Sequence, residues 1–538
     1  MTDTSAPRIG SGEVEGDFWY GRASGTLVLI AAALSVYAVR RTDADLWGYL
    51  AYGRLFLEQG ARVTSDPFAY TSGGLQWVTF EHLAQMSLWV AYSWLGPAGL
   101  VALKCVTGGL AIYFLYVAIR TTTDDAAVWV PVFLLCTSTV ARYFLFRPQL
   151  FTFAFMAVFV AIVTRFLLRG HAALWILPPV MWIWANMHGG FLAGIGVLGL
   201  AILLRAWKNL NADGIGTVRT IGTGTRPLWL ALAVSVLLTL LTPNGPRLWT
   251  YVVTEVLHNT NRRFIAEWSP PSFGNDPWSL IAITILTGSL AIVGGLTHRH
   301  VARVAGLKPW QWLLSCAPLA VMAYLSVRHV PIAAIWIGPV LTILASSVKH
   351  QAGSRPLFRG VWVIVTASAV ASILLMAVAV SVQPLPAINV RASDLGSRNP
   401  CRAVAFLRRN QLRGNVYNPL WWGAYVTWEL YPAIRVSMDG RNISLFSREM
   451  VLENLTFYEG GPDADADVPL RYATDFLLIP TDSPILSRIL MDRRWQMISS
   501  DSDAVLLSRA DLGHEVVQKA FESGSLAPAP EPCPQFLQ

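Results

Sequence analysis

The chain contains 538 residues, of which 54% are hydrophobic and 14% are charged, and its formal net charge is +8. Soluble domains usually carry about 25% charged residues, and the mean hydropathy here is +0.46, so the composition excludes a soluble globular protein and indicates an integral membrane protein. Basic residues in such a protein set its orientation in the membrane. No Lys/Arg run is interleaved with aromatic residues, so we expect no nucleic-acid partner.

The chain begins with a polar segment that is followed by an apolar one. Residues 1–22 are polar and mixed in charge, whereas residues 23–39 are apolar and uncharged. No small-residue cleavage site follows before Arg40, so the apolar segment is predicted to be an uncleaved first membrane helix. Residues 1–22 are predicted to form a cytoplasmic tail.

A loop of unusual composition, residues 40–81, follows this helix. It places four acids among Trp, Tyr and Phe residues, and these acids are Asp43, Asp45, Asp66 and Glu81. Carboxylates crowded among aromatic rings at a membrane surface are costly to desolvate, so they usually mark chemistry or ion binding. The alternative is an interfacial belt, with Trp and Tyr at headgroup level and solvated acids between them.

The remaining membrane helices are predicted from apolar runs, since a span needs about 20 apolar residues. About eleven runs qualify, several of them short, and they place a transmembrane domain over residues 23–389. The runs are residues 23–39, 97–119, 126–141, 149–164, 172–187, 189–204, 227–242, 277–296, 309–327, 330–348 and 361–382.

A further apolar run, residues 80–95, is separated from the next one by Gly96-Pro97 and Gly99. Counting it as a crossing would turn every short basic loop of the later chain outward, although such loops belong in the cytoplasm. We therefore predict a half-length or surface-lying helix here.

The same topology places five junctions that carry functional side-chain types on the external face, next to loop 40–81. They are residues 141–149, 184–191, 242–249, 261–271 and 326–331. Their candidate side chains are Arg147, Asn186, His188, Arg263, Glu267, Arg328 and His329. The functional face is thus predicted to be extracytoplasmic.

Residues 390–512 differ from the preceding chain, because apolar runs shorten and alternating patterns appear. GNVYNP, AIRVSMDGR, ATDFLLIP and AVLLSRA are typical of strands, and helices are predicted at 402–411, 447–457 and 483–492. We expect one extracytoplasmic α/β domain followed by a tail, residues 513–538. Cys401 and Cys533 both fall outside the membrane in this topology, so they are candidates for a disulfide.

The acids allow two chemical interpretations. Asp43 and Asp45 lie two residues apart, where a carboxylate can act as general base toward a hydroxyl or bind a divalent cation. A solvated turn is the alternative for this pair. Asp66 stands before Pro67 and is also explained as a turn residue, and Glu81 is also explained as a helix cap.

The basic residues indicate an anion site. Arg147 offers planar bidentate donors to phosphate, although anchoring to lipid headgroups is the alternative. His188 precedes two glycines that permit close backbone approach. The set contains no thiol and no Ser-His-Asp arrangement, which argues against acyl transfer. It suits stabilisation of a leaving phosphate, with an acid as base.

Together these residues resemble the GT-C glycosyltransferase superfamily, polytopic enzymes that use polyprenyl-phosphate-linked sugars, and more closely its uncharacterised bacterial members. The matching stretches are DADLWGYLAYGRLFLEQG, SDPFAYTSGGLQWVTFEHLAQ, FRPQLFTF, WANMHGGFLAG, TPNGPRLW, IAEWSPP, NVYNPLWWGAYVTWELYP and VSMDGRN. Members often have His-Glu-Trp-Leu where this chain has Phe-Glu-His-Leu, so the role of Glu81 is what carries over from that motif.

The resemblance implies a GT-C-like membrane domain and an inverting transfer of sugar to an acceptor hydroxyl of a glycan, lipid or protein. Asp45, or Asp43, would be the general base. Arg147, His188 and Arg263 would hold the lipid phosphate, with Arg328 and His329 beside them. No cofactor is implied, and metal independence is favoured over a divalent metal at Asp43 and Asp45. The implied location is a bacterial cytoplasmic membrane, with the active face outside.

Two other functions remain open from the sequence. A lipid or polysaccharide transporter is expected to show inverted repeats and interrupted spans in matching halves, and the sequence shows no such symmetry. A non-catalytic membrane scaffold that retains the GT-C fold is consistent with the same residues, because residue types alone do not establish turnover.

Overall fold

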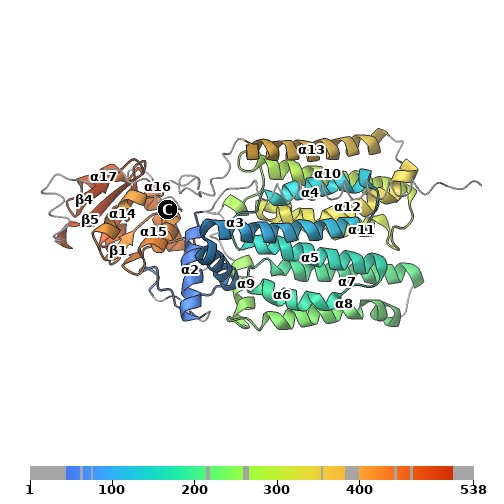
Figure 1. The fold of residues 1–538 in the computed structure, drawn as a ribbon, viewed down its shortest axis with the longest axis horizontal. Helices are drawn as coiled ribbons and strands as arrows, with labels where there is room; N and C mark the ends of the chain where they lie inside the picture. The colour runs from blue at the N-terminus through green and yellow to red at the C-terminus, as the bar shows by residue number, and fades with distance from the viewer. Residues whose placement is uncertain are drawn as a thin grey trace, which may run out of the picture.

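Two parts of different character make up the chain in the computed structural model (Figure 1), a bundle of long helices and a smaller part that contains a sheet. The structure describes residues 44–60, 63, 65–73, 75, 77–213, 218–257, 266–352, 356–381, 399–441, 445–460 and 464–512. The tails predicted at 1–22 and 513–538 and the span predicted at 23–39 lie outside these residues.

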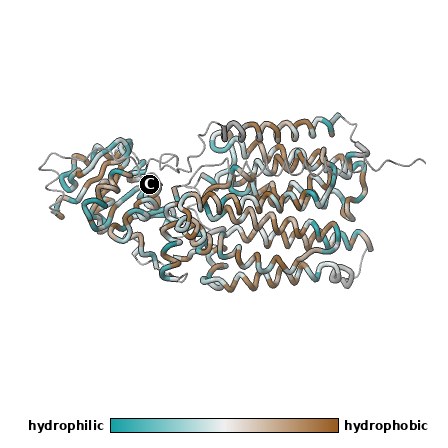
Figure 2. The backbone as a smooth tube through the Cα atoms, in the orientation of Figure 1, coloured by the Kyte–Doolittle hydropathy of each residue, from teal (hydrophilic) through white to brown (hydrophobic). Residues whose placement is uncertain are grey.

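The helix bundle follows the apolar runs of the sequence, because every run predicted from residue 97 onward overlaps one of its helices. In chain order these are α3 (His82–Arg120), α4 (Ala126–Ala141), α5 (Gln149–Arg169), α6 (Leu177–Ala185), α7 (Phe191–Asp213), α8 (Val218–Thr239), α9 (Arg247–Leu257), α10 (Pro277–His300), α11 (Pro309–Leu325), α12 (Val330–Ala352) and α13 (Pro356–Ser381). Hydrophobic residues run along their length in Figure 2.

Within the described residues, five helices are long and apolar enough to cross a membrane, so the predicted count of about eleven spans is not confirmed. These five are His82–Arg120, Gln149–Arg169, Phe191–Ala212, Pro277–His300 and Val327–Lys349. Shorter apolar helices are Ala126–Ala141, Leu174–Ala185, Gly224–Thr239 and Phe358–Ala371. The chain is a multi-pass membrane protein.

Helix α3 is interrupted where the sequence predicts a break. Gly96 has φ 59° and ψ −145°, outside the helical region, and Pro97 follows it. Pro97 has no N–H to donate to the preceding turn, and a β-carbon at Gly99 would lie 1.8 Å from the Ala91 carbonyl oxygen. The residues from His82 to Leu95 therefore form a helical segment of their own before the kink.

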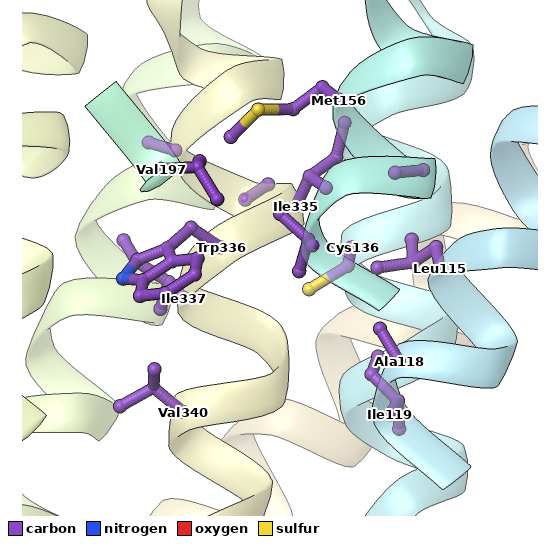
Figure 3. Close-up of a cluster of buried hydrophobic side chains, with 14 of the residues drawn as sticks. Leu115, Ala118, Ile119, Cys136, Met156, Val197, Ile335, Trp336, Ile337 and Val340 are labelled. Carbon is purple, nitrogen blue, oxygen red and sulfur yellow. The ribbon is translucent and has the colours of Figure 1, made fainter. Parts of the chain in front are cut away.

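The bundle core lies where α3, α4, α5, α7 and α12 meet (Figure 3). Cys136 on α4 and Trp336 on α12 are buried there. Gly338 lets the two helices approach, because a β-carbon at this position would lie 2.9 Å from the Cys136 sulfur. Lipid tails are as apolar as these side chains, so close van der Waals packing is what stabilises this core.

The smaller part, here called the C-terminal unit (residues 399–512), contains a five-stranded sheet in the order β2-β1-β3-β5-β4. Its strands are β1 (Gly414–Tyr417), β2 (Ile434–Val436), β3 (Phe476–Pro480), β4 (Trp495–Ser500) and β5 (Ala504–Arg509). Strand β1 is parallel to β2 and β3, whereas β5 is antiparallel to β3 and β4. Its helices are α14 (Cys401–Arg409), α15 (Gly423–Leu430), α16 (Arg448–Glu459) and α17 (Leu486–Met491).

These elements confirm the strands and helices predicted in this region, with two additions, helix α15 and strand β4. Strand β4 is not predicted by the sequence, because it is an edge strand with an irregularity between Met497 and Ser499 that interrupts the alternation of apolar residues. Cys401 is disulfide-bonded, and its expected partner Cys533 lies outside the described residues.

The first loop packs against the C-terminal unit. Its helix α2 (Leu46–Gln59) lies between the two parts of the structure in Figure 1. Trp47 of α2 packs edge-on against Tyr425 of α15, with ring centroids 5.4 Å apart. Ala69 pairs in parallel with Val436 of β2, since Tyr70 N–H donates to the Val436 carbonyl at 3.0 Å. The loop thus extends the sheet beyond its edge strand β2.

Candidate active site

Asp45, Arg147 and Glu267 form the first group of candidate residues that the structure brings together. Arg147 Nη2 lies 3.4 Å from Asp45 Oδ2, and Arg147 Nη1 donates to Glu267 Oε1. Asp45 caps α2 by position, but its carboxylate makes no capping hydrogen bond. The side chains of Asp45, Arg147 and Glu267 are 31%, 18% and 27% exposed, so solutes can reach this group.

Two helix junctions hold these residues in place. Arg147 lies in the turn between α4 and α5, where its N–H donates to the Leu145 carbonyl at 2.8 Å. Glu267 lies in a short 3-10 helix, η3 (Ala266–Trp268). Its carbonyl accepts a hydrogen bond from Ser326 Oγ at 3.0 Å, which ties η3 to the junction of α11 and α12.

Glu81, His188 and Arg328 form the second group. Arg328 Nη2 lies 2.7 Å from His188 Nε2, and Glu81 Oε1 lies 3.8 Å from the same nitrogen. Arg328 comes from η4 (Val327–His329), and its guanidinium lies 5.2 Å from the centroid of the Trp268 ring. Since Trp268 follows Glu267 directly, η3 contributes to both groups.

Both ring nitrogens of His188 have polar neighbours. Gly190 N–H donates to Nδ1 at 3.0 Å, and Thr152 Oγ1, which accepts from Trp184 Nε1 at 2.9 Å, lies 2.8 Å from Nδ1. A backbone N–H and a guanidinium both only donate, so His188 lies between a donor at Nδ1, from Gly190, and a donor at Nε2, from Arg328.

The two groups share one electrostatic environment. Burial lowers the pKa of His188 well below its ordinary value, and the positive charges of Arg328 and Arg147 lower it further. Burial raises the pKa of Glu81 to about 7, although the same two arginines oppose this shift. His188 is therefore neutral near pH 7, and Glu81 changes its protonation state in that range.

Asp66 is a predicted site residue that lies apart from these two groups. Both carboxylate oxygens of Asp66 have partners outside the two groups. They accept the N–H groups of Phe68 and Ala69 at 3.0 Å, and Arg441 donates to Oδ1 at 2.7 Å. Asp66 is thus a buried structural ion-pair partner. Asp43 and Arg263 lie outside the described residues.

Asn186 and His329 lie beside the site and support its shape. The Asn186 carbonyl accepts the N–H of Leu83 at 3.1 Å, which ties the α6–α7 turn to the start of α3. Its side chain donates to the Trp182 carbonyl at 2.8 Å. The His329 ring packs edge-on against Trp268, with centroids 5.8 Å apart.

Sequence reasoning missed Thr152 and Trp268, which orient His188 and Arg328, and also Gly440 of the C-terminal unit, which lies against Asp45. Thr152 and Trp268 fall within or beside motifs that the sequence singled out, so their position was a usable signal. Nothing local in the sequence connects Gly440 to Asp45.

Asp45 and Glu267 both lie beside one cationic side chain. Within the described ranges, no group of three or more His, Cys, Asp or Glu residues is arranged to hold a metal ion. A guanidinium already lies between the carboxylates of Asp45 and Glu267, so these two acids share Arg147 as their cation.

Comparison with solved structures gives matches across most of the chain. The oligosaccharyltransferase AglB from Archaeoglobus fulgidus, in complex with an inhibitory peptide and a dolichol-phosphate, matches with a TM-score of 0.55 and 14% identity, over 86% of this chain and 70% of that chain. An Archaeoglobus fulgidus oligosaccharyltransferase tethered with an acceptor peptide gives a TM-score of 0.51 and 12% identity, over 85% of this chain and 68% of that chain. ArnT from Cupriavidus metallidurans bound to undecaprenyl phosphate gives 0.48 and 13% identity, over 92% and 98%.

No protein-family model and no curated protein matches the sequence. The identities to the archaeal enzyme are far too low to transfer an activity, but its match extends through both the helix bundle and much of the remaining chain. The resemblance inferred from the sequence motifs is therefore confirmed at the level of fold: the chain has the fold of the Archaeoglobus fulgidus oligosaccharyltransferase.

Proposed function

We propose that the chain is a membrane glycosyltransferase that moves a sugar from a polyprenyl-phosphate donor to an acceptor hydroxyl, with inversion at the sugar C1. The observation that carries this proposal is the convergence of Arg147, Arg328 and neutral His188 beside the carboxylates of Asp45 and Glu81. Such a site offers donors to an anion and a base to a hydroxyl within one electrostatic environment. The dolichol-phosphate in the AglB structure supports a lipid phosphate as the anion.

The contact between His188 and Arg328 supports a phosphate seat at this position. Arg328 Nη2 donates to His188 Nε2 at 2.7 Å. A guanidinium carries five N–H donors in a planar fork, so Arg328 can hold an anionic oxygen and His188 together. Charge-assisted hydrogen bonds of this kind are roughly twice as strong as neutral ones.

Asp45 is proposed to be the general base. The acceptor hydroxyl gives its proton to Asp45 as its oxygen attacks C1 of the sugar, and the bond from C1 to the phosphate oxygen breaks on the opposite side. The polyprenyl phosphate leaves with the electron pair of that bond, and Arg328, His188 and Arg147 stabilise its charge. A single displacement of this kind inverts the configuration at C1.

Glu81 is proposed to assist on the donor side. Its pKa of about 7 leaves a substantial protonated fraction at neutral pH. In that form its carboxyl donates a hydrogen bond to the departing phosphate, whereas the ionised form repels it. Arg147, His188 and Arg328 are here called the cation set. Arg263 and His329 are proposed to complete it, and Asp43 to modulate Asp45.

No metal is proposed for this reaction, because Arg147 supplies the positive charge between Asp45 and Glu267.

The proposed location is a bacterial cytoplasmic membrane, with the site and the C-terminal unit on the extracytoplasmic face, since the short basic loops fall on the opposite side. A glycan, lipid or protein carries the acceptor hydroxyl. The proposed division of the chain is the tail 1–22, the membrane domain 23–389, the α/β domain 390–512 and the tail 513–538.

The test is an assay of the purified protein in detergent or vesicles with polyprenyl-phosphate sugars, following release of polyprenyl phosphate. We expect release that depends on Asp45, with the anomeric configuration of the product opposite to that of the donor. A folded protein that binds polyprenyl phosphate but releases none from any donor would instead be a non-catalytic scaffold with this fold.

A further inference from the structure

A turn of the C-terminal unit, residues 437–441, lies against the carboxylate of Asp45. The turn follows β2 and contains Gly440, and a β-carbon at this glycine would lie 2.1 Å from Asp45 Oδ1, 2.9 Å from Cγ and 3.5 Å from Oδ2. These distances leave no room for a side chain at position 440. The backbone of a segment remote in sequence therefore forms one wall of the candidate site.

The two oxygens of Asp45 consequently face different parts of the protein. Oδ2 faces Arg147 of the helix bundle at 3.4 Å, whereas Oδ1 is the oxygen closest to Gly440. A carboxylate confined on both sides has a defined orientation, and a general base needs one to reach the proton that it takes.

The turn itself is held rigidly by buried ion pairs. Arg441 donates to Asp439 through Nε at 2.9 Å and Nη2 at 2.7 Å, and to Asp66 through Nη1 at 2.7 Å. The side chain of Arg441 is 6% exposed, and those of Asp66 and Asp439 are 0% exposed. The Arg441 guanidinium also lies 4.5 to 5.3 Å from the ring centroids of three aromatic residues, which are Tyr52, Phe68 and Trp77.

Further hydrogen bonds fix the chain just before Gly440. Asn418 Nδ2 donates to the Met438 carbonyl at 2.9 Å, and Thr71 Oγ1 donates to the Ser437 carbonyl. Met438 and Asp439 are therefore held by the sheet and by the first loop at once. Gly440 has little freedom to move away from Asp45.

A purely structural role explains Asp439 and Arg441 but not the glycine between them. Gly440 does not have a positive φ, unlike other glycines of the described chain such as Gly414. Its backbone conformation is therefore open to any residue. Only the space that Asp45 occupies demands a glycine at this position.

We propose that Gly440 is a positioning residue for Asp45, and that the C-terminal unit thereby completes the site of transfer instead of serving as an appended binding module. This inference rests on the proposed function. Gly440 touches the general base but takes no part in proton transfer. The C-terminal unit thereby limits the position of Asp45 Oδ1, the oxygen closest to Gly440.

The kinetic test is Gly440→Ala in the purified protein. The added methyl group displaces the Asp45 carboxylate, and a misplacement of about 1 Å can cost roughly 100-fold in rate. We expect kcat to fall by about that factor while the affinity for polyprenyl phosphate changes much less, because the substitution replaces no residue of the cation set and only shifts the partner of Arg147. A kcat equal to that of the wild type overturns the proposal.

The matched control is Gly460→Ala, at the end of α16 in the same unit. A β-carbon there would lie 2.3 Å from the Thr456 carbonyl oxygen, so this substitution strains the backbone of the same unit at a position that does not touch Asp45. We expect Gly460→Ala to lower Tm while retaining the kcat of the folded protein. An equal fall of kcat in both variants would mean that general damage to the unit, and not the position of Asp45, causes the loss, and would overturn the proposal.

A second measurement needs no activity. Gly440→Ala should lower Tm in the wild-type background and lower it much less in an Asp45→Ala background, because the carboxylate that it displaces is gone. Equal shifts in both backgrounds reject the contact and the proposal with it.

If the wild type transfers sugar and Asp45→Asn does not, but Gly440→Ala keeps full kcat, the proposed function stands and the positioning role fails. If no transfer occurs at all, both fail, even where the Tm coupling confirms the contact.

Discussion

Arg441 of the C-terminal unit donates to the buried carboxylate of Asp66 in the first loop at 2.7 Å, across 375 residues of sequence. The same guanidinium also holds Asp439, so one cation balances two fully buried acids. A cation removed from such a set leaves uncompensated buried charge, whereas an exposed ion pair contributes little. This relationship joins the loop that carries Asp45 to the C-terminal unit.

We predict that Arg441→Leu destabilises the protein by about 3–5 kcal/mol, with a clear fall of Tm in thermal unfolding. The control is Asp467→Asn, which breaks the ion pair between Asp467 and Arg494. The side chain of Arg494 is 51% exposed and that of Asp467 is 61% exposed. That change should cost no more than about 1 kcal/mol. Equal Tm values for the two variants would show that the buried set does not hold the loop to the sheet.

Substitutions in the cation set should weaken donor binding more than they lower the stability of the fold. Loss of one charge-assisted hydrogen bond costs roughly 1.5–3 kcal/mol, so Arg328→Gln, His188→Ala and Arg147→Gln are each expected to weaken polyprenyl phosphate binding by about 10- to 100-fold. Binding is measured with the purified protein by displacement of a labelled lipid phosphate. Arg494→Gln, on the exposed surface of the C-terminal unit, serves as control. Unchanged affinity in all three variants would identify the residues as headgroup anchors.

Much of this site is predictable because its residues lie at helix junctions on one side of the bundle. Apolar runs locate the helices, and the basic loops assign the sides, so the amino-acid sequence alone suffices to group Arg147, His188 and Arg328. The break at Gly96 follows from glycine and proline chemistry. These features are local in sequence, and local patterns are what a single sequence displays.

The contacts that the sequence does not reveal are long-range. Asp66 shares a loop with Asp45, which predicts a place in the same pocket, yet it pairs with Arg441. No local sequence pattern indicates a contact between residues so far apart in the chain. Gly440 has an ordinary backbone conformation, so only the folded structure shows what excludes a side chain there. The number of spans is also hard to predict, because several runs are shorter than about 20 residues.

Glu81 should impose a pH dependence on transfer. Its pKa is raised to about 7, so the carboxyl is protonated below that pH and ionised above it. We expect kcat/KM for the donor to fall as pH rises through about 7, because the ionised form repels the phosphate. Glu81→Gln should remove this decline, since the amide remains neutral at every pH. The pKa of His188 is shifted in the opposite direction, so that ring stays neutral across this range. A decline that persists in Glu81→Gln would assign it to another group.

The orientation of the chain is testable by thiol labelling in intact cells. Met491 is 77% exposed in the C-terminal unit, and Arg303 is exposed in the junction between α10 and α11. With an impermeant reagent we expect Met491→Cys to react and Arg303→Cys to react only after the cells are opened. Each variant is compared with the parent protein, which corrects for its own cysteines. The reverse pattern would place the C-terminal unit in the cytoplasm.

The mechanism is tested most directly at Asp45. Asp45→Asn keeps the shape of the side chain but removes the base, so the protein should fold with a Tm near that of the wild type. Loss of a general base costs about 100- to 10,000-fold in rate, or roughly 3–5 kcal/mol of barrier. A chelator separates this role from metal binding, because Arg147 is the cation between Asp45 and Glu267. We expect a chelator to leave wild-type transfer unchanged, whereas abolition of transfer that added divalent metal restores would make Asp45 a metal ligand. Wild-type turnover in Asp45→Asn would exclude Asp45 as the base and leave the phosphate site without its proposed partner.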